Sequence, residues 1–235
     1  DKIGFFKEKT RDVVDVDSCL LMTDTINNYL KKARDILSFR ERNHFLIKEI
    51  HISGSDETIA LVRLSDNIKN PSDMALRFLE QGFSGVVIND SKVINQYGKS
   101  YISLDLEGMK YTISPLSFFQ SHWKLNQAIV RFIIENIDFQ DKIVLDLYSG
   151  AGNFSLPISR YAREVIAVEE NPYAIGDGKR NVNINNIKNC NIIFSPVERF
   201  DFKKPDILIV DPPRAGLTNI VIEKILKILP ERILY

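Results

Sequence analysis

The chain has 235 residues, 44% of them hydrophobic, which is enough for two modest domains or one large one with real cores. Lysine plus arginine equals aspartate plus glutamate at 31 each, so no global positive charge could hold a nucleic acid by electrostatics alone. The two cysteines, Cys19 and Cys190, lie far apart, which excludes a disulfide framework and predicts a reduced, cytoplasmic protein. No apolar run approaches the length of a membrane span, and no signal-peptide pattern is present, so we expect no association with a membrane.

The first section of the chain, residues 1–115, mixes helical and strand patterns and predicts a small α+β domain. The sheet of this domain is expected to be antiparallel, with one face in solvent. Thr23 or Asp24 can cap a first helix that reaches Leu37, and a second helix is capped by Ser72 and stopped by Gly82. The expected strands are 44–52 and 58–64, joined by a turn at 54–56, followed by 85–89, 101–106 and 110–113.

The second section, residues 116–235, has a different pattern. A helix over 124–137 is followed by short apolar runs that alternate with helical segments. Strands that are apolar on both faces and separated by helices indicate a parallel, doubly wound sheet. The expected strands are 143–147, 165–168, 191–194, 206–210 and the start of a fifth at residue 232.

The strongest local motif is VLDLYSGAGNF, residues 144–154. An apolar strand ends near Asp146, and Gly150 and Gly152 then allow close approach of the backbone to a ligand before a helix begins near Asn153. This arrangement predicts a nucleotide-type site, although a pair of glycines also occurs in ordinary strand-to-helix loops. A dinucleotide fingerprint would place a third glycine where Ser155 stands, so the motif disfavours NAD.

Two acidic residues follow later strands of the predicted sheet. Glu169 ends the second strand, 19 residues after Gly150 (169 − 150), where a carboxylate can accept both hydroxyls of a ribose; the alternative is a solvated carboxylate at a strand end. Asp211 begins the sequence Asp-Pro-Pro-Arg after the fourth strand, and the two prolines predict a rigid exit loop. In isolation this sequence would be a plain turn, but behind the glycine loop it indicates a site for a planar base.

Taken together, five segments resemble the RNA (uracil-5-)-methyltransferase family, most closely its 23S rRNA type. The resemblance extends to residues 4–19 and implies a class I S-adenosylmethionine methyltransferase, with a Rossmann-like α/β sheet that is incomplete here and follows a smaller α+β domain. The five segments are SPLSFFQ (114–120), VLDLYSGAGNF (144–154), AVEENP (167–172), RNVNINNI (180–187) and DPPRAGL (211–217).

By this resemblance the residues that contact S-adenosylmethionine or lie beside it are Gln120, Tyr148, Gly150, Gly152, Asn153, Glu169 and Asp211. Asp211 is the candidate catalytic residue, near the sulfonium and the target base, and no metal ligand is expected. Without the resemblance, Gln120 would be taken as a surface residue, and Phe118 and Phe119 as core residues. Arg214 could meet an RNA phosphate or simply be solvated.

The resemblance also names groups that this sequence does not contain. In the family a cysteine attacks carbon 6 of uracil and a glutamate removes the carbon 5 proton, and both would lie after Tyr235. We therefore expect a chain trimmed at both ends and inactive by itself, in which Cys190 is a buried small residue. Cys19 matches the last of four cysteines that bind an iron-sulfur cluster in relatives, so a cluster is expected only in a longer parent.

The predicted function is methylation of carbon 5 of a uridine in RNA, with ribosomal RNA favoured over transfer RNA and no protein partner implied. Two alternatives remain open on the residues alone. One is another RNA methyltransferase, acting on cytosine carbon 5 or on an amino group. The other is a non-catalytic RNA-binding protein that keeps the cofactor fold.

Overall fold

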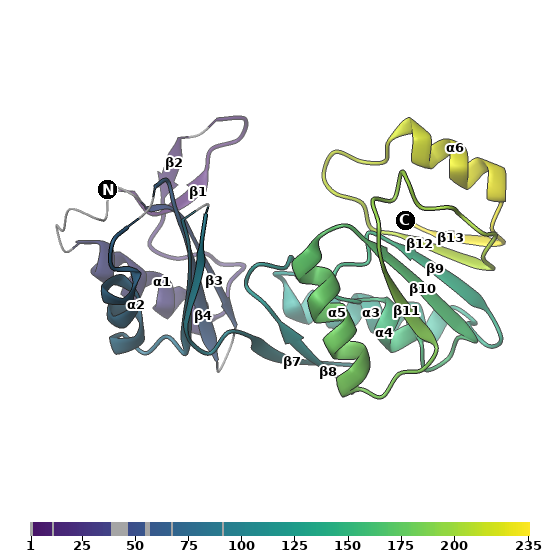
Figure 1. The fold of residues 1–235 in the computed structure, drawn as a ribbon, viewed down its shortest axis with the longest axis horizontal. Helices are drawn as coiled ribbons and strands as arrows, with labels where there is room; N and C mark the ends of the chain where they lie inside the picture. Colours follow the sequence, from purple (N-terminus) through teal and green to yellow (C-terminus); the bar gives the residue numbers. More distant parts are fainter. Residues whose placement is uncertain (1, 11, 39–46, 55–56, 67, 91) are drawn as a thin grey trace. The chain divides into compact units, whose positions relative to one another are not determined.

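The structure is a computed structural model that describes residues 2–10, 12–38, 47–54, 57–66, 68–90 and 92–235 (Figure 1). It divides the chain into two compact units, Asp1–Ile102 and Ser103–Tyr235. This boundary lies earlier than the one predicted at residue 115. The reason is that strand β8 (Met109–Ile113), which pairs with β7 (Ile102–Leu106), packs against helix α5 (Pro172–Ile184) of the second unit.

The first unit contains a four-stranded sheet in the order β3-β4-β5-β6, and helices α1 and α2 pack against it. The hairpin β3-β4 and both predicted helices are confirmed, while residues 44–46 and 55–56 of the predicted hairpin lie outside the described residues. The bounds are α1 (Asp24–Ser38), β3 (Ile47–Gly54), β4 (Thr58–Leu64), α2 (Pro71–Glu80), β5 (Gly85–Asn89) and β6 (Ile94–Gly98), and a separate ribbon pairs β1 (Gly4–Phe6) with β2 (Val13–Asp15).

Three expectations for this unit are wrong. The sheet is mixed, because β4 and β5 run parallel and α2 connects them. These two strands are buried almost throughout instead of exposing one face to solvent. Helix α2 begins at Pro71 after an N-cap at Asn70 that makes no side-chain hydrogen bond, whereas Ser72 was the expected cap. The fixed φ of proline suits the first helical position, which explains the earlier start.

The second unit is built on a five-stranded sheet in the order β11-β10-β9-β12-β13, and every neighbouring pair is parallel. The predicted doubly wound sheet is therefore confirmed. The chain leaves β9 toward β11 and then returns to β12, so the direction of winding reverses between β9 and β12. The bounds are α3 (Trp123–Asn136), β9 (Ile143–Leu147), α4 (Ser155–Ile158), β10 (Glu164–Glu169), β11 (Cys190–Phe194), β12 (Ile207–Val210), α6 (Asn219–Ile228) and β13 (Arg232–Leu234).

The register shows which helix covers which face of this sheet. Leu145 pairs with Leu208, and both belong to an apolar cluster that includes Val221 and Ile225 of α6, so α6 covers this face. The next residues along the strands point the other way. Ile192 lies on that opposite face, where Gly178 of α5 approaches it closely. Within the described residues, none of the helices is long and apolar enough to cross a membrane.

Candidate functional site

A pocket lies at the carboxyl ends of β9 and β12, the point where the strand order reverses. Open α/β sheets bind ligands at this position, because the loops that follow the two strands diverge there. The pocket is partly open to solvent, and roughly 370 Å³ of non-atom space, which includes solvent at its mouth, lies between its walls. It is lined by Phe118, Phe119, Gln120, Tyr148, Ser149, Gly150, Ala151, Asn153, Phe154 and Asp211.

The glycine loop after β9 turns sharply, with Tyr148, Gly150 and Gly152 at φ values of 62°, 56° and 91°. A Cβ built on Gly150 would have only the carbonyl oxygen of Phe118 near it, at 3.9 Å, so the space above this glycine is open. A Cβ on Gly152 would instead lie 2.0 Å from Cδ1 of Leu156. Gly150 therefore faces the pocket, whereas Gly152 is required for packing behind the loop.

Glu169 holds the glycine loop from the neighbouring strand. Its Oε2 accepts a hydrogen bond from the backbone N–H of Gly150 at 2.8 Å. Its Oε1 accepts two more, from Glu170 at 2.8 Å and Asn171 at 2.7 Å. An ionised carboxylate has about four acceptor positions, so three are used by the backbone and about one remains for a ligand hydroxyl.

The floor of the pocket contains buried polar side chains. Asn153 and Asn126 of α3 bind each other through both amides, with N···O distances of 2.7 Å and 3.0 Å. Ser149 is buried, and its hydroxyl has no hydrogen-bond partner in the part of the chain that the structure describes. The hydroxyl oxygen is itself buried, so it makes no exposed polar contact on the pocket surface, and leaving it unpaired costs free energy.

Asp146 lies beneath the glycine loop and is 1% exposed. Ser155 donates a hydrogen bond to its Oδ2, whereas Oδ1 has no partner among the described residues. The pKa of Asp146 is raised to about 7, chiefly by burial and to a lesser extent by the nearby carboxylates of Asp211 and Glu169, while the hydrogen bonds with Ser155 act in the opposite direction. The carboxylates of Asp211 and Glu169 therefore disfavour ionisation of Asp146, and a cationic ligand nearby would favour it.

Gln120 and Asp211 meet at the mouth of the pocket, where Nε2 of Gln120 donates to Oδ2 of Asp211 at 3.2 Å. Solvent reaches Asp211, yet desolvation by the atoms around it raises its pKa, and the hydrogen bond from Gln120 acts in the opposite direction. The expectation of a core position is wrong for Phe118, which is 70% exposed at the pocket. Gln120, which the residues without the resemblance would have left on the surface, is partly buried and lines the pocket.

The structure brings five of the predicted cofactor residues together as pocket lining, Gln120, Tyr148, Gly150, Asn153 and Asp211. Glu169 supports the loop from behind, and Gly152 packs against Leu156. Residues that the sequence analysis did not assign to the site are Phe118, Phe119, Ser149, Ala151 and Phe154. All five lie inside the SPLSFFQ and VLDLYSGAGNF segments, and this position in the sequence could have predicted that they line the pocket.

Cys190 stands at the beginning of β11, whereas the pocket lies beyond the other ends of the strands. Burial raises the pKa of its thiol to about 12, and Asp146 adds to this effect. The thiol is therefore protonated and cannot act as a nucleophile. Among the residues that the structure describes, no group of three or more His, Cys, Asp or Glu side chains could hold a metal ion.

A family model for tRNA (uracil-5-)-methyltransferase matches residues 5–235. The chain belongs to this family. The resemblance found on the sequence motifs is thereby confirmed at the level of the family, as is the class I methyltransferase fold.

The chain is similar in sequence to two uncharacterised RNA methyltransferases. One, from Nanoarchaeum equitans (strain Kin4-M), is 38% identical over 171 residues, which cover 72% of this chain and 38% of that protein. The other, from Aquifex aeolicus (strain VF5), is 28% identical over 253 residues, which cover 100% of this chain and 57% of that protein. The chain thus spans about half the length of the curated relatives that it matches.

The fold of the chain is similar to that of methyltransferases with solved structures. The tRNA (uracil-54, C5)-methyltransferase of Pyrococcus abyssi, solved with S-adenosyl-L-homocysteine, superposes with a TM-score of 0.74 at 24% identity over 97% of this chain and 61% of that one. A tRNA m1G37 methyltransferase from M. jannaschii gives a TM-score of 0.52 at 20% identity over 84% of this chain and 59% of that one. The predicted preference for ribosomal RNA finds no support in these names, which refer to transfer RNA.

Proposed function

We propose that this chain binds S-adenosylmethionine in the pocket at the ends of β9 and β12, and that it is part of an enzyme that methylates carbon 5 of a uridine in RNA. The observation that carries the proposal is the open space above Gly150, bordered by Gln120 and Asp211 at the point where the strand order reverses. Membership of the uracil-5 family supports both the cofactor and the reaction.

The residues at this site fit the cofactor chemically. S-adenosylmethionine supplies an electrophilic methyl group on a sulfonium cation, and the acidic cluster of Asp146, Glu169 and Asp211 favours a cation by simple electrostatics. The remaining acceptor position of Glu169 suits a ribose hydroxyl. Tyr148 packs partly against the α6-side cluster and lines the pocket with the rest of its ring.

The chemistry at uracil requires an additional nucleophile, because carbon 5 becomes reactive only after addition of a thiolate to carbon 6. Within residues 103–235 the sole cysteine is the buried Cys190, which does not face the pocket. We therefore propose that the chain binds the cofactor without completing methyl transfer by itself. The target base is expected to leave its stack to reach Asp211, which would act beside the transferred methyl group.

The first test is binding of S-adenosylhomocysteine to the 235-residue chain, measured by titration calorimetry. Gly150→Ala places a methyl group in the open space of the pocket, and we expect affinity to fall about tenfold or more. Gly82→Ala is the matched control, because Gly82 also has a positive φ, of 86°, but lies in the first unit. The proposal fails if the wild-type chain binds no cofactor, or if both variants bind as the wild type does.

The second test concerns the reaction and the RNA. Labelled S-adenosylmethionine is supplied with unmodified transfer RNA or ribosomal RNA, first to the chain alone and then to a longer protein in which the chain is continued by a segment that contains the family's cysteine. We expect no incorporation by the chain alone and 5-methyluridine from the longer protein. Transfer to another base, to an amino group or to nothing would refute the uracil-5 assignment and favour one of the two alternatives.

A further inference from the structure

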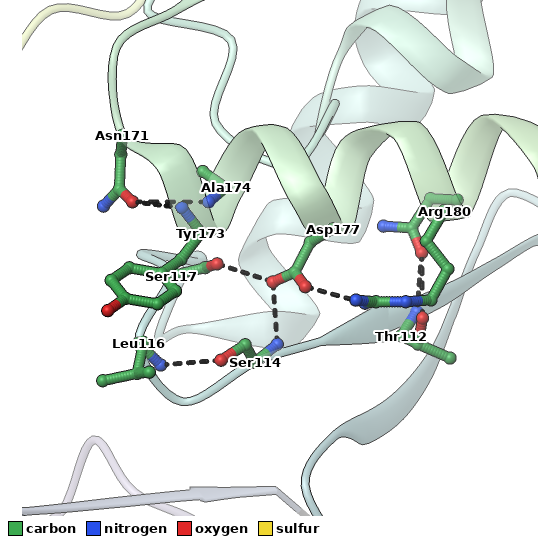
Figure 2. Close-up of polar contacts among 10 residues, drawn as sticks. Thr112, Ser114, Leu116, Ser117, Asn171, Tyr173, Ala174, Asp177 and Arg180 are labelled. Carbon is green, nitrogen blue, oxygen red and sulfur yellow. Dashed lines mark hydrogen bonds and ion pairs between the residues drawn. The ribbon is translucent and has the colours of Figure 1, made fainter. Parts of the chain in front are cut away.

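A row of polar side chains on one face of α5 binds the free edge of strand β8. Asp177, Asn181 and Asn185 follow one another at intervals of four residues. Asn185 Oδ1 accepts from the backbone N–H of Lys110 at 2.8 Å, Asn181 Oδ1 from Thr112 at 2.8 Å, and Asp177 Oδ2 from Ser114 at 2.8 Å. Figure 2 shows the Asp177 end of this ladder.

The two periods match, which explains why a helix can bind a strand in this way. Four helical residues advance about 6 Å, and two strand residues advance about 6.6 Å. The other edge of β8 pairs with β7, so the helix side chains take the place of a third strand. The N–H groups of residues 110, 112 and 114 are therefore satisfied although β8 is an edge strand.

Asp177 differs from the two asparagines because it also binds the loop that leaves β8. Ser117 donates its hydroxyl to Oδ2 of Asp177 at 2.5 Å, and Arg180 donates to Oδ1 at 2.8 Å. The backbone N–H of Ser117 also donates to the carbonyl of Ser114 at 3.0 Å. The carboxylate is 1% exposed, so these contacts are made out of water, where they are strongest.

The loop fixed in this way carries the pocket wall. Phe118, Phe119 and Gln120 follow Ser117 directly, and all three line the pocket. The ring of Phe119 lies 5.6 Å from that of Tyr111 and 5.5 Å from that of Trp123. Tyr111 in turn donates its hydroxyl to the carbonyl of Gly152 in the glycine loop, at 3.0 Å.

We propose that Asp177 is a positioning residue for the cofactor pocket, which clamps residues 114–117 so that Gln120 reaches Asp211 and the Phe118–Phe119 wall stands over the glycine loop. Asp177 does not line the pocket itself, so it acts through the loop. This inference rests on the proposed cofactor site and adds a residue to it that no motif comparison assigned.

The test uses the 235-residue chain with S-adenosylhomocysteine as the probe and Asp177→Asn as the main variant. An amide keeps the shape, and one amide oxygen can still accept from both Ser114 and Ser117, which share Oδ2. The substitution removes the negative charge that strengthens these two bonds, and it removes the ion pair with Arg180. We expect affinity to fall about tenfold. We also expect the emission of Trp123, the only tryptophan in the chain, to shift, since the Phe119 contact depends on the loop.

Asn185→Ala is the control, because it breaks two hydrogen bonds to Lys110 at the other end of the same ladder. It should destabilise the chain while leaving both cofactor affinity and Trp123 emission unchanged. Ser117→Ala removes only the hydroxyl contact and should weaken binding in the same direction as Asp177→Asn, whereas Ser117→Thr, which keeps the hydroxyl, should bind normally. This pair keeps the test open if Asp177→Asn does not fold.

Equal losses of affinity in Asp177→Asn and Asn185→Ala would show general destabilisation and overturn the proposal. Wild-type affinity in both Asp177→Asn and Ser117→Ala would overturn it as well. A wild-type chain that binds no S-adenosylhomocysteine would refute the proposed function instead. In that event the clamp is judged on Trp123 emission, and unchanged emission in Asp177→Asn overturns it.

Discussion

The two units of the chain bury very different side chains. Among the described residues of the first unit, Thr58 and Asp90 are the buried polar side chains, and the rest of its core is apolar. The second unit buries a larger set, Ser114, Asn126, Asp146, Ser149, Asn153, Ser155, Ser159, Asp177 and Asn181. Most of these lie in the pocket, under the glycine loop or on the α5 ladder.

Burying polar groups costs free energy unless each finds a partner, so a fold selected for stability alone would avoid them. In the second unit, buried polar groups fix the loops that follow the strands and lie around the proposed cofactor pocket. The first unit is held by packing, for example by Phe78 against Phe83 at 5.2 Å between ring centroids. The difference separates a unit whose described core is chiefly a scaffold from one whose core is part of a site.

The largest loss of stability should follow from a cavity created in the apolar core of the first unit. Phe78 is fully buried, so Phe78→Ala should lower the free energy of unfolding by about 3–5 kcal/mol, measured by urea denaturation. Affinity for S-adenosylhomocysteine should remain within about twofold while the variant is folded, because the pocket belongs to the other unit.

The control for this variant is Leu76→Ala on the same helix, where the side chain is 55% exposed. It should change stability by no more than about 0.5 kcal/mol. Loss of cofactor affinity in a folded Phe78→Ala chain would contradict the separation of roles between the two units.

The second prediction concerns the second unit and tests how its stability depends on pH through the buried carboxyl group of Asp146. Because the pKa of Asp146 is raised from 3.8 to about 7, the folded state keeps a proton that the unfolded state releases between about pH 4 and 7. Stability should therefore fall as pH rises through that window, by about 4 kcal/mol at most, with no further loss from this group above it.

Asp146→Asn removes the titrating group, so its stability relative to the wild type should increase from pH 5 to pH 8 in urea denaturation. Asp201→Asn, at an exposed position of the same unit, should show no such trend. A wild-type chain whose pH dependence matches that of Asp146→Asn would show that the buried carboxyl is ionised at little cost.

The smallest effect concerns the two thiols, one in each unit. Cys19 is partly exposed, whereas burial raises the pKa of Cys190 to about 12. A disulfide reagent at pH 8 should titrate one thiol in the native chain and two in urea, and Cys19→Ser should reduce the native count to none. Rapid reaction of Cys190 in the native state would mean that local opening of the second unit at strand β11 exposes this thiol.

The strand pattern of the second unit was predictable because parallel strands buried on both faces appear in the sequence as short apolar runs. Residues 143–147 and 206–210 correspond to β9 and β12 to within one residue. The first unit was harder to predict, because nothing local distinguishes a parallel pair from an antiparallel one. Strand β6, with the sequence INQYG, carries too little apolar character to be recognised.

The sequence by itself determined the parallel sheet, the glycine loop and the family, since each depends on residue types at fixed spacings along a short segment. Only the tertiary structure showed that Gly152 serves packing, that Glu169 is largely occupied by backbone N–H groups, and that Asp177 holds a loop 60 residues before it in the chain. These three assignments depend on which groups approach each other across the fold. The spacing of residues along a segment does not specify such distances.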